Sequence, residues 1–322
     1  MTGMLRPAAL LGLGSHRPAR RDDNHLIAQR TNSSDEWIRD RSGIVTRGVA
    51  GDDESVVDMA SSAGGKALAA AGVDAADVGL VLLATCSMPG PLPGGSPEVA
   101  YRLGARHAGA SDIGAGCAGF TYALAMAADT VRAGTAEHVL VIGAEKLLPM
   151  VNPVDRGTAF LFGDGAGAAV VGRADLHGMP TDGIGPVVWH HEGDQHDRLV
   201  IDGAPLQLRM EGRAIYRWAT TALPDLARLA CERAGITPQE LAAFVPHQAN
   251  LRITESIVKS LGLPDSVVVA RDVIDSGNTS AASVPLALTR LHEQGEIRRG
   301  DPVLLFGFGA GLTAAGQVVR CP

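Results

Sequence analysis

The chain has 322 residues, of which 46% are hydrophobic and 4% aromatic, and its formal net charge is −7 at pH 7. Such an acidic chain is unsuited to nucleic acid or to an anionic membrane as its main partner. No apolar run reaches the roughly 18 residues of a membrane span, and the apolar segment near the N-terminus is too short for a secretory signal. Four cysteines without a Cys-x-x-Cys pair favour neither a zinc site nor a disulfide framework. We therefore expect a cytoplasmic protein without a bound metal.

The chain contains an internal repeat. Residues 71–84 (AGVDAADVGLVLLA) and 234–247 (AGITPQELAAFVPH) each follow a helix-like run, at about 55–70 and 213–233, and each ends in a short apolar strand. The two copies begin about half the chain apart. Two copies of a β/α module with buried strands predict an α/β fold, in which helices cover parallel or mixed sheets.

A second correspondence follows each copy. After the first copy come the helix-like run behind Cys117 and the strand HVLVIGA (138–144), and after the second come SAASVPLALTRLHEQG (280–295) and PVLLFGFGA (302–310). We therefore expect two related halves, an N-terminal half over 1–172 that carries a cysteine and a C-terminal half over 173–322 that carries a histidine and an asparagine.

Three side chains stand at matching points of the two copies. Cys117 lies between the strand-like stretch 111–115 and a helix, so the N-terminus of that helix points at its sulfur. Asn278 takes the same place in the second copy, and the strand at 244–246 ends at His247. A helix N-terminus with an imidazole nearby lowers the pKa of a thiol from about 8.5 and creates a nucleophile. A single cysteine is often only a small buried hydrophobe, but this matched placement favours catalysis.

Six motifs follow one another in the order of a known family. The pair HQAN and GNTSAAS is the most specific of them, and the chain resembles the β-ketoacyl-acyl-carrier-protein synthases III, ketosynthases of the thiolase fold. The resemblance implies a thiolase-like duplicated β/α module, layered α-β-α-β-α with two mixed sheets. The motifs are SSDEWIRDRSGI (33–44), DIGAGCAGF (112–120), FLFGDGAGAAVV (160–171), VPHQANLRI (245–253), GNTSAASVPLAL (277–288) and GFGAGLT (307–313).

The resemblance also implies a reaction. Cys117 would take an acyl group from an acyl-coenzyme A, and His247 and Asn278 would bind the thioester carbonyl of a malonyl group on acyl-carrier protein. Decarboxylation would give a carbanion that attacks the acyl-cysteine, a decarboxylative Claisen condensation that starts a fatty acid or a polyketide. Backbone N–H groups of Cys117 and Ala310 would form the oxyanion hole. This chemistry needs no metal or redox cofactor.

The coenzyme A entrance is assigned by resemblance. Trp37, Arg41 and Arg156 would line it, because tryptophan and arginine faces hold adenine and arginine pairs with phosphate. The alternative interpretation is that the two arginines make ordinary ion pairs on the surface.

A basic stripe is expected on the helix that follows His247. Arg252, Ser256 and Lys259 recur on one helical face, and Arg217 is expected nearby. A strongly acidic carrier protein would suit this stripe on an otherwise acidic enzyme. A solvated helix face is the alternative for Lys259.

The acyl pocket departs from the family pattern. Leu92 lies in a Pro/Gly-rich stretch, residues 88–97, and aligns with a side chain that in the family crosses a homodimer interface into the partner's acyl pocket. Phe308 is also assigned to the pocket, and Ser111 stands where a bulky aromatic residue is common. These departures leave open the starter acyl group and the choice between a housekeeping and a specialised pathway.

Other motifs are given structural interpretations. The glycine-rich stretches at 12–14, 163–168 and 309–314 lack the context that nucleotide binding needs, so we expect tight turns where strands pass the active centre. The histidine-rich stretch at 188–198 matches no zinc spacing, and we expect a surface loop there.

Three alternative functions compete with this condensation. A related acyltransferase would pass the acyl group to a hydroxyl, an amine or a carrier thiol without condensation, but the presence of Asn278 argues against it. A type III polyketide synthase shares the Cys-His-Asn set, yet GNTSAAS and SSDEWI favour the synthase III branch. A non-catalytic partner subunit would be expected to lack the thiol.

Overall fold

The computed structural model describes residues 6–322, and within that range most strands belong to two five-stranded mixed sheets. The first has the order β1-β7-β6-β4-β5 and the second the order β12-β11-β13-β14-β8. The strands of the first are β1 (Ala8–His16), β4 (Val78–Ala84), β5 (Gly109–Ile113), β6 (His138–Glu145) and β7 (Gly165–Arg173). Those of the second are β8 (Val188–His191), β11 (Ala243–Pro246), β12 (Val268–Val269), β13 (Pro302–Gly309) and β14 (Thr313–Arg320).

The two sheets repeat each other strand for strand. In the first, β4 is parallel to β5 and β6, whereas β7 is antiparallel to β6 and β1. In the second, β11 is parallel to β12 and β13, whereas β14 is antiparallel to β13 and β8. Order and direction agree at every position, which confirms the duplication predicted from the sequence.

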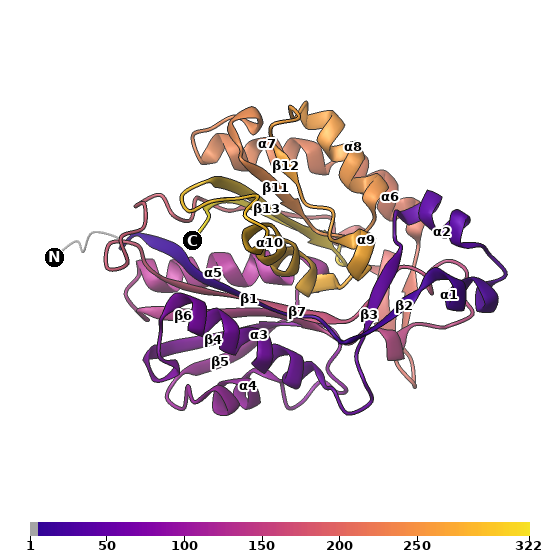
Figure 1. Cartoon of the computed structure of the whole chain (residues 1–322), viewed down its shortest axis with the longest axis horizontal. Helices are drawn as coiled ribbons and strands as arrows, with labels where there is room; N and C mark the ends of the chain where they lie inside the picture. Colours follow the sequence, from indigo (N-terminus) through magenta and orange to yellow (C-terminus); the bar gives the residue numbers. More distant parts are fainter. Residues whose placement is uncertain (1–5) are drawn as a thin grey trace.

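The helices complete five layers (Figure 1). The helices α5 (Gly119–Arg132) and α10 (Ser283–Glu293) lie between the sheets. The outer face of the first sheet is covered by α3 (Val56–Ala71) and α4 (Ser96–Leu103), and that of the second by α6 (Gly212–Thr221), α7 (Leu223–Arg233) and α8 (Leu251–Leu261). This is the α-β-α-β-α arrangement that the resemblance implied. No helix within residues 6–322 is long and apolar enough to cross a membrane.

The two central helices are built from small and apolar residues because sheets cover them on both sides. Phe120 and Leu124 of α5 and Val284 and Leu288 of α10 are buried in one core with strands of both sheets. Burial of each such side chain stabilises the fold by about 1.5–3 kcal/mol. Because both halves contribute to this core, the division at residue 172 remains a prediction rather than a visible boundary.

Local signals set most helix ends. Ser55 and Asp58 form a capping box at the start of α3, and Gly72 ends that helix with a φ of 63°. The single helix expected over 213–233 is instead two helices, α6 and α7, which meet at Ala222. Pro224 lies in the first turn of α7, where it lacks the N–H that would continue the hydrogen bonding of α6.

Two further expectations were wrong. Residues 188–191 form the edge strand β8 of the second sheet rather than part of a loop. Gly165 and Gly167 lie inside β7 rather than in a turn. Gly12 and Gly14 likewise lie inside β1, and a Cβ on Gly12 would lie 2.7 Å from the Ala67 carbonyl oxygen of α3. These glycines therefore allow the helix to approach the strand closely.

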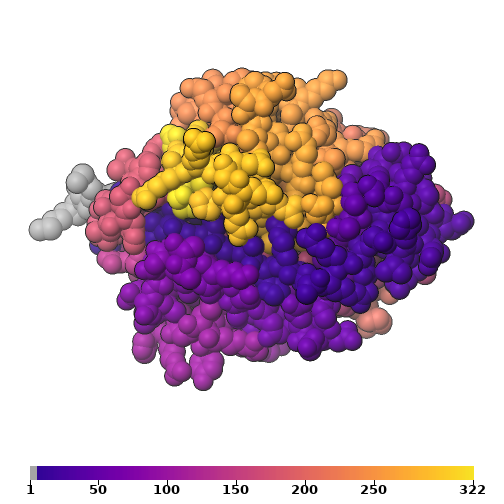
Figure 2. All heavy atoms as spheres, in the orientation of Figure 1, coloured from indigo at the N-terminus to yellow at the C-terminus, as the bar shows by residue number. Residues whose placement is uncertain are grey.

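Short elements frame one end of the molecule. They are β2 (Arg20–Asp23), α1 (Asn24–Thr31), α2 (Asp35–Ser42), β3 (Thr46–Val49), β9 (Leu199–Asp202), β10 (Gln207–Met210) and α9 (Val273–Ser276). Figure 2 shows the N-terminal segment, in indigo, lying directly against the orange C-terminal half.

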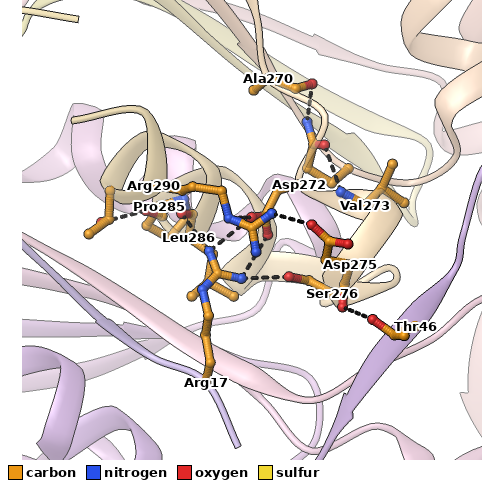
Figure 3. Close-up of polar contacts among 12 residues, drawn as sticks. Arg17, Thr46, Ala270, Asp272, Val273, Asp275, Ser276, Pro285, Leu286 and Arg290 are labelled. Carbon is orange, nitrogen blue, oxygen red and sulfur yellow. Dashed lines mark hydrogen bonds and ion pairs between the residues drawn. The ribbon is translucent and has the colours of Figure 1, made fainter. Parts of the chain in front are cut away.

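An ion-pair cluster joins the halves at this contact (Figure 3). The Asp272 carboxylate accepts hydrogen bonds from Arg17 at 2.9 Å, and its Oδ1 lies 2.8 Å from Nε of Arg290. Arg17 also donates to the Ser276 hydroxyl at 2.5 Å, and Arg290 donates to Asp275 at 2.9 Å. Arg17 follows β1 and the other four residues belong to the second half, so the cluster fixes α9 against the first half.

Candidate active site

Cys117, His247 and Asn278 line one cavity of about 900 Å³. Cys117 lies in the 3₁₀ turn that leads into α5, and His247 directly follows β11. Asn278 lies just before the short turn at the head of α10. The structure thus brings together the three side chains that the sequence placed at matching points of the repeat.

The Cys117 thiol is buried, and burial raises its pKa to about 11. Hydrogen bonds from the Ser280 hydroxyl and from backbone N–H groups of Ala310 and Cys117 lower the pKa, but burial outweighs them. The prediction that the helix N-terminus lowers the pKa of the Cys117 thiol is therefore wrong for the resting site. The same two N–H groups are those assigned to the oxyanion hole, and both lie beside the sulfur.

The His247 imidazole is neutral. Burial lowers its pKa to about 3, and the ring of Phe308 packs edge-on against it with centroids 5.1 Å apart. Nδ1 lies 2.6 Å from the hydroxyl oxygen of Ser283. Phe308 also lines the cavity. The site therefore has an apolar wall beside the His247 imidazole, which the Ser283 hydroxyl holds through Nδ1.

Hydrogen bonds hold both the side chain and the backbone of Asn278. Its Oδ1 accepts the backbone N–H of Ser280 at 2.9 Å, and its own backbone N–H donates to the Leu161 carbonyl at 2.8 Å. Its carbonyl accepts the N–H of Gly163 at 3.0 Å. These contacts leave the amide nitrogen Nδ2 as the donor available to a ligand in the cavity.

A buried carboxyl group behind the site was missed from the sequence. Glu145, at the end of β6, accepts hydrogen bonds from Ser87 Oγ at 2.5 Å, Cys86 Sγ at 3.2 Å and the N–H of Cys86 at 3.1 Å. Burial raises the pKa of Glu145, and the Ser280 hydroxyl is among the groups that lower it. The sequence signal that could have revealed it is a glutamate at the end of an otherwise apolar strand. The Cys86 thiol donates to this carboxylate.

The residues assigned to the coenzyme A entrance lie together at the cavity mouth. The guanidinium carbons of Arg41 and Arg156 lie 5.2 and 4.6 Å from the ring centroid of Trp37. Phe160 packs edge-on against Trp37 at 5.3 Å. All four residues line the cavity, so an aromatic ring flanked by two cations is presented to an entering ligand.

Two of the three basic residues assigned to carrier docking line the same cavity. Arg217 and Arg252 line the cavity, and the guanidinium of Arg252 lies 5.4 Å from the ring centroid of Tyr216. Lys259, two turns further along α8, is exposed but does not line the cavity. Arg213 of α6 was missed from the sequence and belongs with them. Together they give an acidic enzyme a local basic surface.

Leu92 does not line the cavity of its own chain, and 86% of its side chain is exposed. The loop that carries it is held where backbone N–H groups of Gly95 and Ser96 donate to Asp112 of β5, both at 2.8 Å. Ser111 is exposed on β5, the edge strand of the first sheet. The assignment of Leu92 to an acyl pocket thus depends on a second copy of the chain.

Comparisons with known proteins agree with this geometry. Two family models match the chain: 3-oxoacyl-[acyl-carrier-protein] synthase III over residues 111–193, and the C-terminal region of the same family over residues 231–321. These ranges contain Cys117, His247 and Asn278.

Relatives and solved structures match over nearly the whole chain. A β-ketoacyl-[acyl-carrier-protein] synthase III of Streptomyces coelicolor is 50% identical over 99% of this chain and 100% of its own length. A mycobacterial synthase III of Mycobacterium avium is 46% identical over 97% of this chain and 95% of its own. The crystal structure of a priming β-ketosynthase from a polyketide pathway superimposes with a TM-score of 0.96 at 43% identity, covering 100% of this chain and 98% of the other. The chain belongs to the 3-oxoacyl-[acyl-carrier-protein] synthase III family.

Proposed function

We propose that the three cavity residues divide the family's reaction between acyl transfer on Cys117 and decarboxylation at His247 and Asn278. The chain is an acyltransferase, and its reaction is the decarboxylative condensation that starts a fatty acid or a polyketide. The observation that carries the division of roles is the meeting of a thiol and two neutral hydrogen-bond donors in one cavity.

In the first step the Cys117 sulfur attacks the carbonyl carbon of an acyl-coenzyme A. The carbon–sulfur bond to coenzyme A breaks, and the leaving thiolate takes up the proton that Cys117 gives up. Backbone N–H groups of Cys117 and Ala310 already lie beside the sulfur, so they are placed to stabilise the oxyanion of the tetrahedral intermediate.

In the second step a malonyl thioester binds with its carbonyl oxygen between His247 and Asn278. Its terminal carbon–carbon bond breaks, carbon dioxide leaves, and the electron pair moves into an enolate. Both donors are neutral, because the low pKa of His247 keeps its ring uncharged. Neutral donors suit an oxygen that gains charge only as the bond breaks.

In the third step the enolate carbon attacks the acyl-cysteine carbonyl. A carbon–carbon bond forms, the bond to sulfur breaks, and the Cys117 thiolate takes up a proton. The product is a β-ketoacyl thioester. All three steps use side chains and backbone N–H groups of this chain, and we propose that no metal or redox cofactor takes part.

The residues at the mouth of the cavity suit two thioester substrates, an acyl-coenzyme A and a malonyl carrier protein. The Trp37 ring with Arg41 and Arg156 suits the adenine and phosphates of coenzyme A. The exposed cations Arg217 and Arg252 suit the acidic surface of a carrier protein. We propose that the extender is carried by that protein, in the reduced cytoplasm where the four free cysteines persist as thiols.

A homodimer is part of the proposal. Among residues 6–322 no strand pairs with the outer edge of β5, and the large apolar side chains of Leu92, Tyr101 and Met126 are exposed. Unpaired edges and exposed apolar groups favour association with another chain. Analytical ultracentrifugation would test it: a chain that sediments as a monomer at micromolar concentration would contradict the dimer.

Two half-reactions test the division of roles. After incubation with acyl-coenzyme A, intact-mass measurement and peptide mapping should place the acyl group on Cys117. His247→Ala and Asn278→Ala should still be acylated, yet release carbon dioxide from a malonyl carrier about 10²–10³ times more slowly, the usual cost of a lost oxyanion donor. An adduct on Cys86, or wild-type carbon dioxide release by Asn278→Ala, would contradict the proposal. Acyl transfer without carbon dioxide release would favour the non-condensing alternative.

A further inference from the structure

Ser283 makes a contact with the active-site histidine that the reaction scheme has not used. It is the first residue of α10 and is completely buried. Its hydroxyl oxygen lies 2.6 Å from Nδ1 of His247 and also accepts the backbone N–H of Gln248 at 3.3 Å. Among residues 6–322 the hydroxyl has no other hydrogen-bond partner.

The direction of the 2.6 Å hydrogen bond follows from the protons available. The imidazole is neutral, because burial lowers its pKa to about 3, so one ring nitrogen carries a proton and the other does not. If Nδ1 carried the proton and donated to Ser283, the buried hydroxyl proton would have no acceptor among residues 6–322, and an unpaired buried donor is destabilising. If Ser283 donates to a bare Nδ1, the hydroxyl proton has an acceptor and the hydroxyl oxygen still accepts the N–H of Gln248.

We propose that Ser283 is a positioning residue that holds His247 in the tautomer with its proton on Nε2. Nδ1 is turned toward α10, so Nε2 is the nitrogen left to the cavity that His247 lines. In this tautomer the ring presents an N–H to the oxygen of a bound malonyl thioester. The inference rests on the proposed function, in which that N–H stabilises the enolate.

The same turn orients the second donor. The backbone N–H of Ser280 binds Oδ1 of Asn278 at 2.9 Å, which leaves the N–H group of the amide for the ligand. Ser280 and Ser283 thus each occupy the acceptor atom of one catalytic side chain and leave its donor free. One short segment, residues 280–283, therefore makes both His247 and Asn278 hydrogen-bond donors toward the cavity.

The tautomer has a consequence for the thiol. A protonated Nε2 has no lone pair in the ring plane, so this atom of His247 is not the acceptor of the proton that Cys117 loses. Variants that change the tautomer should therefore alter decarboxylation and leave acylation of Cys117 nearly unchanged.

The test compares Ser283→Ala with Thr289→Val. Thr289 is also buried on α10, and within the described part of the chain its hydroxyl bonds only to the Pro285 carbonyl of the same helix, at 2.7 Å. The control therefore removes a hydroxyl that does not touch the site. Protein labelled with ¹⁵N-histidine reports the tautomer by NMR in the resting enzyme, and His247→Gln assigns the signal. Wild type and Thr289→Val should show the proton on Nε2, and Ser283→Ala should show it shifted toward Nδ1.

Activity provides the second readout. Ser283→Ala should release carbon dioxide from a malonyl carrier at least 10-fold more slowly, up to the roughly 10²–10³-fold cost of a lost oxyanion donor, while Cys117 is acylated within about twofold of the wild-type rate. An unchanged tautomer, or an equal loss in both half-reactions, would overturn the proposal. A wild-type enzyme without acylation or carbon dioxide release would instead refute the proposed function, since the tautomer is measured without turnover.

Discussion

Gly309 leaves the space that the Cys117 side chain occupies. A Cβ atom on Gly309, at the end of β13, would lie 2.7 Å from Cβ of Cys117 and 2.9 Å from its sulfur. Real Cβ atoms essentially never come that close. The space for the Cys117 side chain in the first half therefore depends on the absence of a side chain at residue 309 in the second half.

Gly309→Ala should displace the thiol. Overpacking of this kind typically costs about 1–3 kcal/mol, and a displacement of about 1 Å lowers rates about 10²-fold. We expect acylation of Cys117 to slow by that factor in stopped-flow mass measurements. Gly65→Ala on α3 is the control, because its Cβ would meet only Leu103, at an ordinary 3.6 Å. Equal rates for the two variants would contradict this role of Gly309.

The pH dependence of alkylation reports the pKa of Cys117. Below its pKa of about 11, each pH unit raises the thiolate fraction tenfold, so the iodoacetamide rate should still be rising at pH 9. A thiol activated by the helix N-terminus alone would reach its plateau near pH 7. Cys117→Ser provides the background rate of the other cysteines. A plateau below pH 8 would show that burial does not control this thiol.

Arg252→Glu should weaken productive encounters with the malonyl carrier. Charges at the rim of an interface act mainly on association, and salt screens them. We expect the KM for the carrier to rise and its salt dependence to flatten, while acylation from coenzyme A changes little. Lys259→Glu should behave in the same way, more weakly, because Lys259 lies away from the mouth. Arg298→Glu, at an exposed site on another loop, is the control for net charge.

If the loop that carries Leu92 caps the acyl pocket of a partner subunit, Leu92→Phe should shift the substrate preference toward shorter acyl groups. One buried methylene is worth about 0.8 kcal/mol, so a few carbons shift preference by one or two orders of magnitude. Competition among acetyl, isobutyryl, hexanoyl and octanoyl coenzyme A would measure the shift. Leu176→Phe adds the same ring at another exposed leucine. Identical preferences in both variants would remove Leu92 from the acyl pocket.

Asp272→Ala should destabilise the protein and impair Asn278 together. The carboxylate is buried while Arg17 and Arg290 are only about a fifth exposed, and removal of one partner from a buried ion pair costs about 3–5 kcal/mol. The cluster also fixes α9, which leads through Gly277 to Asn278. Chemical denaturation should show the loss, and carbon dioxide release should fall more than acylation. Arg209→Ala, in an exposed pair with Asp202, should cost less than about 1 kcal/mol.

Local patterns in the sequence were sufficient to predict most helices and strands and to single out Cys117, His247 and Asn278. The capping box at Ser55 and the glycine that ends α3 depend on neighbours a few residues away, and so does the turn that places Cys117 at the head of α5. The duplication was visible because each copy repeats the same local signals in the same order. The GNTSAAS motif contained Ser280 and Ser283 without indicating what either of them binds.

Properties that depend on contacts between distant segments needed the folded chain. The pKa of Cys117 was expected to fall, yet it rises, because the folded chain buries the sulfur, with Gly309 of the second half against it. Glu145 lies 58 residues from Ser87, and Ser283 lies 36 residues from His247, so no local spacing indicates either hydrogen bond. The exposed position of Leu92 likewise follows from the packing of a whole loop on β5. Burial and hydrogen-bond direction are properties of the assembled layers, and they decide which nitrogen of His247 is left to the cavity.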